Sequence, residues 1–333
     1  MKKIVLSLVA VCVALAVMAP LPCVAGEKVN LSYSIFLPEK HAQAQAAIQW
    51  AKEVEKRTNG DVTITVFAGG TLTKGPNVYE GVVSGISDIG NSCFAYTSGR
   101  FPVMQAIDLP MAYPNGKVAS RVANDFAMKH ADQDLKDVKL LYVHAHGPGL
   151  LHTQKPVRNL ADLKGMKIRS TGFSAEVVTA LGGVPVAMGQ GGAYEALKTG
   201  VVEGTITPIE SLKGWKQAEV VNYTTECSAV GYTTAMFVVM NKDKWNSLSA
   251  DTQKIMEDVS AEWVDVHGVA WDVADDEGRA FTLEKGNEII PLDDKENALW
   301  SETAQPVITK YEESTPNGST YVTEIREAIK KAL

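Results

Sequence analysis

Cysteine, basic charge and long apolar runs are all scarce in this sequence. Of the four cysteines in 333 residues, Cys12 and Cys23 fall within the first 25. The remaining two, Cys93 and Cys227, are 134 residues apart, and we expect two buried thiols rather than a disulfide. With no disulfide framework, a chain of this length has to be stabilised by its own hydrophobic cores, and it is long enough for two of them.

The shortage of basic residues restricts the partners of this chain. Lysine and arginine total 32 against 39 acids, a formal net charge of −7. Residues 1–25 contain Lys2 and Lys3 but no acid, so the remainder carries 30 minus 39, or −9. This charge argues against nucleic acid as a partner and against attraction to an anionic membrane surface. A site for an anion in such a protein has to be made locally.

One long apolar run is present, at the N-terminus. Lys2 and Lys3 precede residues 4–19, which are apolar except for Ser7, and Cys23-Val24-Ala25 offers small residues where a signal peptidase cuts. The run is shorter than the roughly 20 residues that a spanning helix needs. We therefore expect a secretory signal over residues 1–25, cleaved after Ala25, with no stable membrane insertion and a periplasmic mature protein. Lipidation at Cys23 is disfavoured because Leu21-Pro22 lacks the small residue expected there.

The signatures of common catalytic and cofactor sites are also missing. The sequence has no Gly-x-Ser-x-Gly, no His-Glu-x-x-His, no phosphate-loop lysine motif and no Gly-x-Gly-x-x-Gly. His144 and His146 alternate along an expected strand with His152 close behind, but no fourth ligand for a tetrahedral metal stands at a useful spacing. We expect no catalytic residue, no metal and no cofactor.

What the sequence does contain is a place to hold an anion. A short strand at residues 166–168 ends on Arg169, and twenty residues later the loop Gly189-Gln190-Gly191-Gly192 opens a helix at Ala193. An arginine at a strand end, facing the free N–H groups of a helix start, is suited to bind a carboxylate or a similar anion. This combination predicts capture rather than chemistry.

An internal sequence similarity predicts that the chain contains two similar halves. Residues 78–88 (VYEGVVSGISD) resemble residues 193–203 (AYEALKTGVVE), and each reads as a helix, a glycine C-cap and a short strand. Strands at 29–35, 61–67 and 139–144 alternate with helical patterns, which is typical of mostly parallel, doubly wound sheets. Residues 232–241 read as a strand that returns to the first sheet. Residues 251–277 read as one long helix whose inward side carries Ile255, Val259, Trp263, Val266 and Val269-Ala270.

At these motifs the chain resembles the solute-binding proteins of tripartite ATP-independent periplasmic (TRAP) transporters, the DctP family. The most specific parts are DLKGMKIR at 162–169, the YEALKTGVVEG run ending at Gly204, residues 82–88 and the GRFP corner at 99–102. The resemblance covers essentially all of residues 26–333. It implies a two-lobed periplasmic-binding-protein-like α/β fold with doubly wound sheets, hinge strands and a long lobe-spanning helix.

The expected domain organisation follows from the resemblance and the strand pattern together. We expect the signal peptide at 1–25, lobe I at 26–145 plus 234–273, and lobe II at 146–233 plus 274–333. The resemblance also implies that the lobes close on a small organic anion, which is delivered to a permease with a small and a large membrane subunit.

The resemblance assigns the substrate clamp to Arg169, because a family arginine ends the matching strand and grips the substrate carboxylate. Guanidinium is always charged and its planar fork fits two carboxylate oxygens. Where better-known members carry a stacking aromatic this chain has Gln190, and where they carry asparagine before proline it has Thr207, with Ser211 one turn further. Gly149 occupies the position at which family members that bind larger ligands carry a second arginine. We therefore expect a lining of hydroxyls, an amide and glycines rather than aromatic plates, suited to a hydroxy- or keto-carboxylate or a short sulfonate.

Other candidate binding residues sit near the expected cleft. Tyr96, with Ser92 behind it, follows a strand whose carboxyl end should face the ligand. Lys74 is either a second positive contact or a solvated loop lysine, and His41 either faces the cleft or solvent at a helix start. Trp215 is either a pocket wall or a core residue.

Three alternatives to a TRAP receptor are open at this point. The same pocket would serve a receptor of an ATP-driven importer, or a sensor that passes its closed form to a membrane kinase. A periplasmic hydrolase or isomerase is disfavoured because no nucleophile or paired-carboxylate arrangement is legible.

Overall fold

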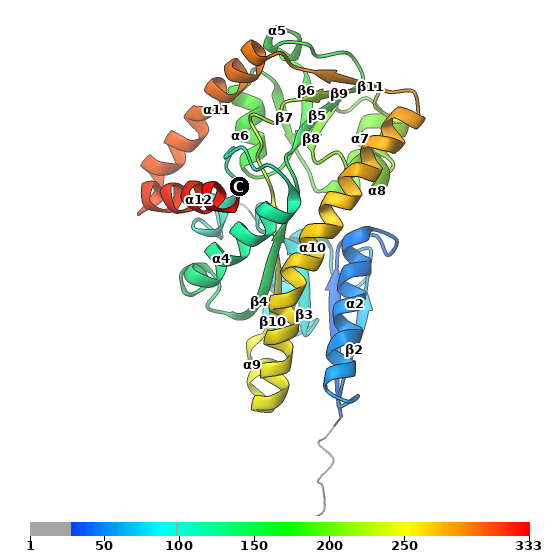
Figure 1. Ribbon diagram of the computed structural model, residues 1–333. Helices are drawn as coiled ribbons and strands as arrows, with labels where there is room; N and C mark the ends of the chain where they lie inside the picture. Colours follow the sequence, from blue (N-terminus) through cyan, green and yellow to red (C-terminus); the bar gives the residue numbers. More distant parts are fainter. Residues whose placement is uncertain (1–27, 98) are drawn as a thin grey trace, which may run out of the picture.

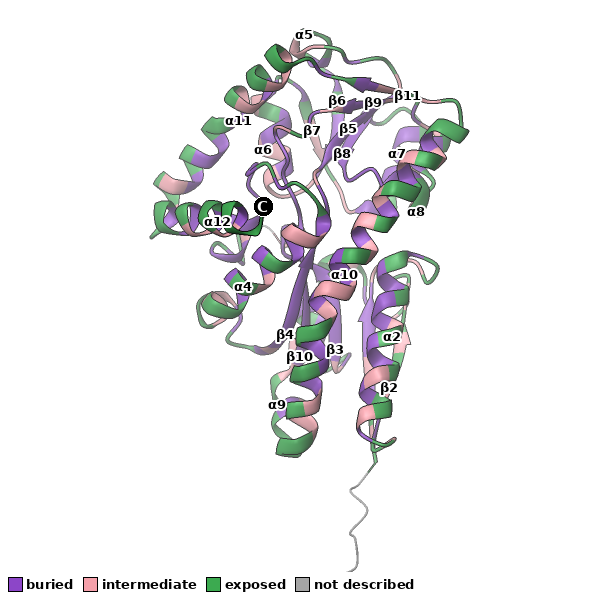
Figure 2. Cartoon of the chain, in the orientation of Figure 1, coloured by how far each residue is buried: buried purple, intermediate pink, exposed green. Residues whose placement is uncertain are grey.

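The computed structural model describes residues 28–97 and 99–333 and shows a two-lobed α/β protein (Figure 1). The expected signal peptide at 1–25 lies outside the described residues. Each lobe is built on one twisted sheet covered by helices, and buried residues concentrate along the strands and the inner helix faces (Figure 2). The fold class expected from the sequence is confirmed.

The first lobe contains a five-stranded sheet in the order β2-β1-β3-β10-β4. β1, β2 and β3 are parallel, and β10 is antiparallel to both of its neighbours, β3 and β4. The strands are β1 (Val29–Ile35), β2 (Val62–Phe67), β3 (Ile89–Cys93), β4 (Val138–Ala145) and β10 (Ala235–Asn241); the helices are α2 (Ala42–Arg57), α3 (Val78–Val83), α4 (Gly116–Asp134) and α9 (Lys242–Asn246). The strand expected at 232–241 therefore does return to the first sheet.

The second lobe contains a six-stranded sheet in the order β11-β9-β5-β8-β6-β7. β6 is parallel to β7 and β8, whereas β5 runs antiparallel to β8 and β9. The strands are β5 (Leu150–Thr153), β6 (Lys167–Ser170), β7 (Val184–Ala187), β8 (Gly204–Thr207), β9 (Tyr223–Glu226) and β11 (Glu288–Pro291); the helices are α5 (Leu160–Leu163), α6 (Phe173–Ala180), α7 (Ala193–Lys198) and α8 (Ser211–Gly214).

The internal sequence similarity corresponds to the same unit in both lobes. α3, a glycine at positive φ and β3 form one copy; α7, a second such glycine and β8 form the other. Both ends of the helix and the start of the strand are displaced by 115 residues. Gly85 and Gly200 have φ values of 76° and 73°, which side chains disfavour, so each ends its helix and turns the chain into the strand. Both strands point their carboxyl ends toward the space between the lobes.

Three segments connect the lobes. The chain crosses between β4 and β5 at residues 146–149 and returns between β9 and β10 at residues 227–234. The two crossings are tied together, because Gly149 N–H donates to the Tyr232 carbonyl (2.9 Å) and Thr233 Oγ1 donates to the His146 carbonyl (2.6 Å). The third connection is α10 (Ala250–Glu284), 35 residues long, which packs on α2 and α4 of the first lobe and on α8 of the second (Figure 1).

The buried face of α10 differs in part from the expected one. Val259 is buried as expected, but Val269 is 47% exposed. The helix instead turns His267, Gly268 and Trp271 inward. A side chain at Gly268 would come within 2.9 Å of the Lys117 backbone, so this close approach to α4 sets the rotation of the helix and leaves Val269 outside. The apolar pattern alone did not predict this buried face of α10, because the face contains polar and small residues.

The last two helices fold back along the molecule. α11 (Asp294–Ser314) packs on α6, and α12 (Gly318–Ala332) packs on α4, as Figure 1 shows at the end of the chain. The break between them falls at Thr315-Pro316-Asn317. None of the helices in the described part of the chain is long and apolar enough to cross a membrane. The lobe boundaries at 145, 233 and 273 stay a prediction.

Candidate functional site

A cavity lies between the lobes, at the carboxyl ends of the equivalent strands β3 and β8. Its volume is about 40 Å³, so the lobes as they stand in this structure leave room for only a few water-sized molecules. Both lobes and both crossings line it, through Phe36, Leu37, Cys93, Tyr96, His146, Arg169, Thr171, Gln190, Thr207, Pro208, Glu210, Ser211, Trp215, Tyr232, Thr234, Met236 and Trp271. Six of the nine site residues expected from the sequence are in this set.

Arg169 is the charged centre of the cavity. β6 places it on the inner side of the second lobe, where only 4% of its surface is exposed. Its Nε donates to the Met188 carbonyl oxygen at 3.0 Å, which orients the guanidinium. Among the described residues, no acid lies within 4.0 Å of its nitrogens. The outer two nitrogens of the fork are thus without a protein counter-charge.

The glycine-rich loop contributes a side chain to the cavity rather than backbone N–H groups. Of its four residues Gln190 lines the cavity, and its backbone N–H donates to Tyr96 Oη (3.2 Å) in the other lobe. The expectation that helix-opening N–H groups face the anion is therefore corrected. Gln190 is 92% buried, and its Nε2 has no hydrogen-bond partner within the described part of the chain. It is a donor available beside Arg169.

Thr207, Ser211 and Glu210 form a connected group in the same lobe as Arg169, where the neighbouring strand β8 ends. Thr207 Oγ1 and Ser211 Oγ are 2.8 Å apart, and Ser211 Oγ donates to Glu210 Oε1 at 2.9 Å. All three are at least 96% buried. Asp275 on α10 accepts from the Glu210 backbone N–H (3.0 Å), and burial together with the Glu210 charge raises the Asp275 pKa to about 7. Glu210 was not among the expected site residues.

His41 approaches this group from the first lobe. Its Nδ1 accepts from the Gln43 backbone N–H at the start of α2 (3.2 Å), so the ring proton of the neutral imidazole is on Nε2. Nε2 lies 3.0 Å from Glu210 Oε2, at an angle unsuited to a hydrogen bond. His41 does not line the cavity itself but a neighbouring groove that shares Glu210 and Trp215 with it.

The histidines near the crossings have separate partners. His146 lines the cavity, its Nδ1 lies 2.5 Å from the Gly147 carbonyl oxygen, and burial lowers its pKa to about 4. His152 contacts Thr224 and the Thr207 carbonyl, and His144 accepts from Trp271 Nε1 at 3.1 Å. Burial lowers the pKa of both, so all three imidazoles are neutral at physiological pH.

Aromatic rings form much of the wall, which corrects the expected lining. Phe36, Tyr96, Trp215, Tyr232 and Trp271 all face the cavity. Phe36 and Trp215 belong to different lobes and stack with centroids 6.4 Å apart at 19°. Phe36 follows β1 at its carboxyl end, so the rule that selected Tyr96 after β3 would also have found it. The sequence does not indicate that Trp271 on α10 lines the cavity, because a tryptophan in a helix is normally predicted to be a core residue.

Two expected residues lie away from the cavity. Ser92 is fully buried and donates to the Gly75 carbonyl at 2.7 Å. Lys74 is exposed in the loop before α3 and does not line the cavity. Cys93 and Cys227 are both buried and not bonded to each other.

The comparison with protein families decides the classification. Residues 33–314 match the model of bacterial extracellular solute-binding proteins, family 7 (DctP). The chain belongs to this family. The DctP proteins are solute-binding proteins of TRAP transporters, so this chain is a binding protein and not an enzyme.

Curated relatives and solved structures of the DctP family match over most of the chain. A C4-dicarboxylate-binding periplasmic protein of Rhodobacter capsulatus is 27% identical, covering 88% of this chain and 89% of the relative. A TRAP periplasmic solute-binding protein of Desulfovibrio salexigens is 31% identical, with a TM-score of 0.81 over 91% of this chain and 96% of that structure. A marine metagenome TRAP protein specific for aromatic acids, crystallised with 3-hydroxybenzoate, is 28% identical, with a TM-score of 0.87 over 92% and 99%. Homologues therefore bind small organic acids outside the cytoplasm.

Gly149 decides how one side of this cavity is filled. A Cβ at this position would lie 1.9 Å from Cε1 of Tyr232, whose hydroxyl donates to the Ile206 carbonyl at 2.9 Å. The tyrosine ring thus occupies the space that a larger residue at 149 would take.

We expect Gly149→Ala to displace this ring and to destabilise the protein by roughly 1–3 kcal/mol, since overpacking forces buried groups apart. Chemical denaturation measures the loss. Gly191→Ala is the matched control, because nothing lies within 4 Å of a Cβ there. Equal stability of the two variants would show that the Tyr232 ring moves aside without lowering the free energy of unfolding.

Proposed function

We propose that this protein is the periplasmic receptor of a TRAP transporter and captures a small organic acid by closing its lobes around Arg169. The observation that carries the proposal is the buried guanidinium with its outer nitrogens unpaired in a cavity between two lobes. A buried charge without a counter-charge is costly, and an entering carboxylate supplies that counter-charge in bidentate geometry. The small and large membrane subunits of the permease receive the closed form, after residues 1–25 have directed secretion.

Contacts between the lobes support closure as the binding step. Gln190 N–H donates to Tyr96 Oη across the cleft, and Trp215 stacks on Phe36 beside it. Each contact joins residues on opposite lobes, so it exists only in the closed arrangement. A ligand that touches Arg169 in one lobe and Tyr96 in the other favours that arrangement, because it makes both contacts only there.

The lining favours a compact acid with one anionic group. Among the described residues that line the cavity, Arg169 is the only arginine or lysine, while five aromatic side chains and Met236 surround the remaining space. Solved relatives hold acids of this kind: benzoate in a Rhodoferax ferrireducens protein and mandelate in one from Bordetella bronchiseptica. A carboxylate fits the planar fork of Arg169; a short sulfonate, with three acceptor oxygens, would also engage Gln190 and Tyr96.

A thermal-shift screen of the mature protein, residues 26–333, tests the proposal. The panel contains benzoate, 3-hydroxybenzoate, mandelate, lactate, pyruvate, succinate and 2-hydroxyethanesulfonate, with the neutral amides as controls. We expect at least one compact monoanion to raise the melting temperature in a concentration-dependent way, because binding to the native state alone stabilises it. A panel in which no acid shifts the transition, or in which the amides shift it equally, contradicts the proposal.

A further inference from the structure

The hydroxyl protons on the cavity wall have a fixed direction. Ser211 has one hydroxyl hydrogen, and it donates to Glu210 Oε1. A carboxylate can only accept, so Ser211 cannot also donate to Thr207. The 2.8 Å contact between Thr207 Oγ1 and Ser211 Oγ therefore has Thr207 as its donor. The lone pairs of Thr207 Oγ1 are left for whatever occupies the cavity.

Glu210 is contacted on both of its carboxylate oxygens. Ser211 Oγ donates to Oε1, and His41 Nε2 lies 3.0 Å from Oε2 without a hydrogen bond. Because the one hydroxyl hydrogen of Ser211 is used by Glu210, Thr207 is left as the donor in its contact with Ser211.

His146 presents an acceptor in the same cavity. A carbonyl oxygen cannot donate, so the contact between Nδ1 and the Gly147 carbonyl requires the proton on Nδ1. The other ring nitrogen, Nε2, then carries a lone pair and has no partner among the described residues. Because the pKa is lowered to about 4, the ring stays neutral and Nε2 stays an acceptor at physiological pH.

The cavity wall therefore contains one group of hydrogen-bond donors and one group of hydrogen-bond acceptors. Arg169 and the unpartnered amide of Gln190 offer donors, whereas Thr207 Oγ1 and His146 Nε2 offer acceptors. β6 and β8 are neighbouring strands, with Arg169 paired with Thr205, so Thr207 lies one pleat further along the next strand. The two Cα positions are about 8 Å apart by strand geometry, a distance that a compact ligand spans.

We propose that the ligand is a hydroxy acid, whose acidic group binds Arg169 and whose hydroxyl donates to Thr207 and His146. A keto acid or an unsubstituted acid offers no donor, so it leaves these buried acceptors without a partner. This inference rests on the proposed function and selects, among small organic acids, those with a free hydroxyl on a short or aromatic body.

Matched ligand pairs test the inference on the unmodified protein by calorimetry. The pairs are lactate with pyruvate and propionate, mandelate with phenylacetate, 3-hydroxybenzoate with benzoate, and 2-hydroxyethanesulfonate with ethanesulfonate. For the pair that binds, we expect the hydroxylated member to bind about tenfold or more tightly, since an unsatisfied buried acceptor is costly. Equal affinity within about twofold, with binding still dependent on Arg169, overturns the inference and leaves the proposed function standing. A protein that binds no acid of any pair overturns the proposed function itself.

Variants of Thr207 and Glu210 test which residues produce the preference for the hydroxylated ligand. Thr207→Val keeps the shape but has no oxygen, and it should reduce the preference for the hydroxylated ligand to about threefold or less. Thr207→Ser, which keeps the oxygen, is the matched control and should retain the preference. Glu210→Gln offers Ser211 an amide donor, which reverses the hydroxyl chain, and should weaken the hydroxylated ligand more than its unsubstituted partner. An undiminished preference in Thr207→Val excludes Thr207 as the acceptor.

Discussion

Replacing Arg169 with alanine should weaken acid binding on the order of a hundredfold or more, because the carboxylate would then be buried in the closed cleft without its counter-charge. Arg169 is 96% buried, and its one hydrogen bond within the described residues runs from Nε to the Met188 carbonyl. The variant should fold normally, since no buried acid depends on this cation among the described residues. Isothermal titration calorimetry with the acid found in the screen measures the loss.

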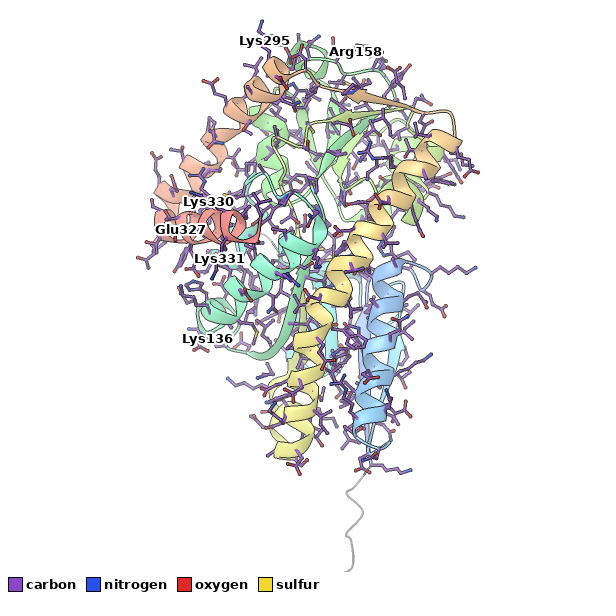
Figure 3. All side chains as sticks on the ribbon, viewed as in Figure 1. Lys136, Arg158, Lys295, Glu327, Lys330 and Lys331 are labelled. Atoms are coloured by element: carbon purple, nitrogen blue, oxygen red, sulfur yellow. The ribbon has the colours of Figure 1, made fainter. Side chains whose placement is uncertain are left out.

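Two further variants separate the role of the fork from that of charge. Arg169→Lys keeps the charge but not the planar pair of donors, and should bind more weakly than wild type and more tightly than alanine. Arg158→Ala removes an exposed arginine paired with Glu288 (2.7 Å), at the outer end of the second lobe in Figure 3, and should leave affinity unchanged. Binding by Arg169→Ala within about tenfold of wild type would refute the assigned role.

Replacing Asp108 with asparagine should stabilise the protein at neutral pH. Asp108 is 2% exposed and accepts from the Ala235 backbone N–H at 2.8 Å, where the second crossing enters β10. Burial raises its pKa from 3.8 to about 8, so at pH 7.5 the folded protein holds a proton that the unfolded chain has released. The stabilising contribution of this carboxyl is complete below about pH 4 and is lost as the pH rises toward 8.

Asparagine keeps the acceptor oxygen for Ala235 and has no proton to hold, so it avoids this loss. We expect Asp108→Asn to raise the free energy of unfolding on the order of 3–5 kcal/mol at pH 7.5, and by less than about 1 kcal/mol at pH 4. Urea unfolding across that pH range measures the difference, with the exposed Asp61→Asn as control for the loss of one charge. A difference that does not change with pH would mean that Asp108 is ionised in the folded protein.

Much of the architecture was readable because it depends on local signals. Alternating apolar and polar residues predicted β1 and β2, the apolar period predicted α10, and Gly85 and Gly200 predicted the ends of equivalent helices. The face of α10 was only partly readable. Its rotation is set by the contact of Gly268 with Lys117, which are distant in sequence.

The site could be predicted at strand ends and at positions matched by the family resemblance. Arg169 and Tyr96 follow from the first and Thr207 from the second, and the structure brings all three into one cavity. Glu210 and Trp271 follow from neither, because an acid in a loop and a tryptophan in a helix are common outside binding sites. The sequence presents His146 only as one of three closely spaced histidines, and the tertiary structure shows that it lines the cavity.

The sequence by itself determined the family, the two α/β halves and the position of the guanidinium, since these are set by local patterns and by one strand with its flanking turn. Only the tertiary structure decided which groups are left unpaired. Whether Gln190 has a partner, or in which direction the Thr207 hydroxyl donates, depends on residues brought together from both lobes and from α10. Contacts between residues distant in sequence satisfy most of the buried donors and acceptors. The donors and acceptors around the cavity that stay without a partner determine which ligand can bind.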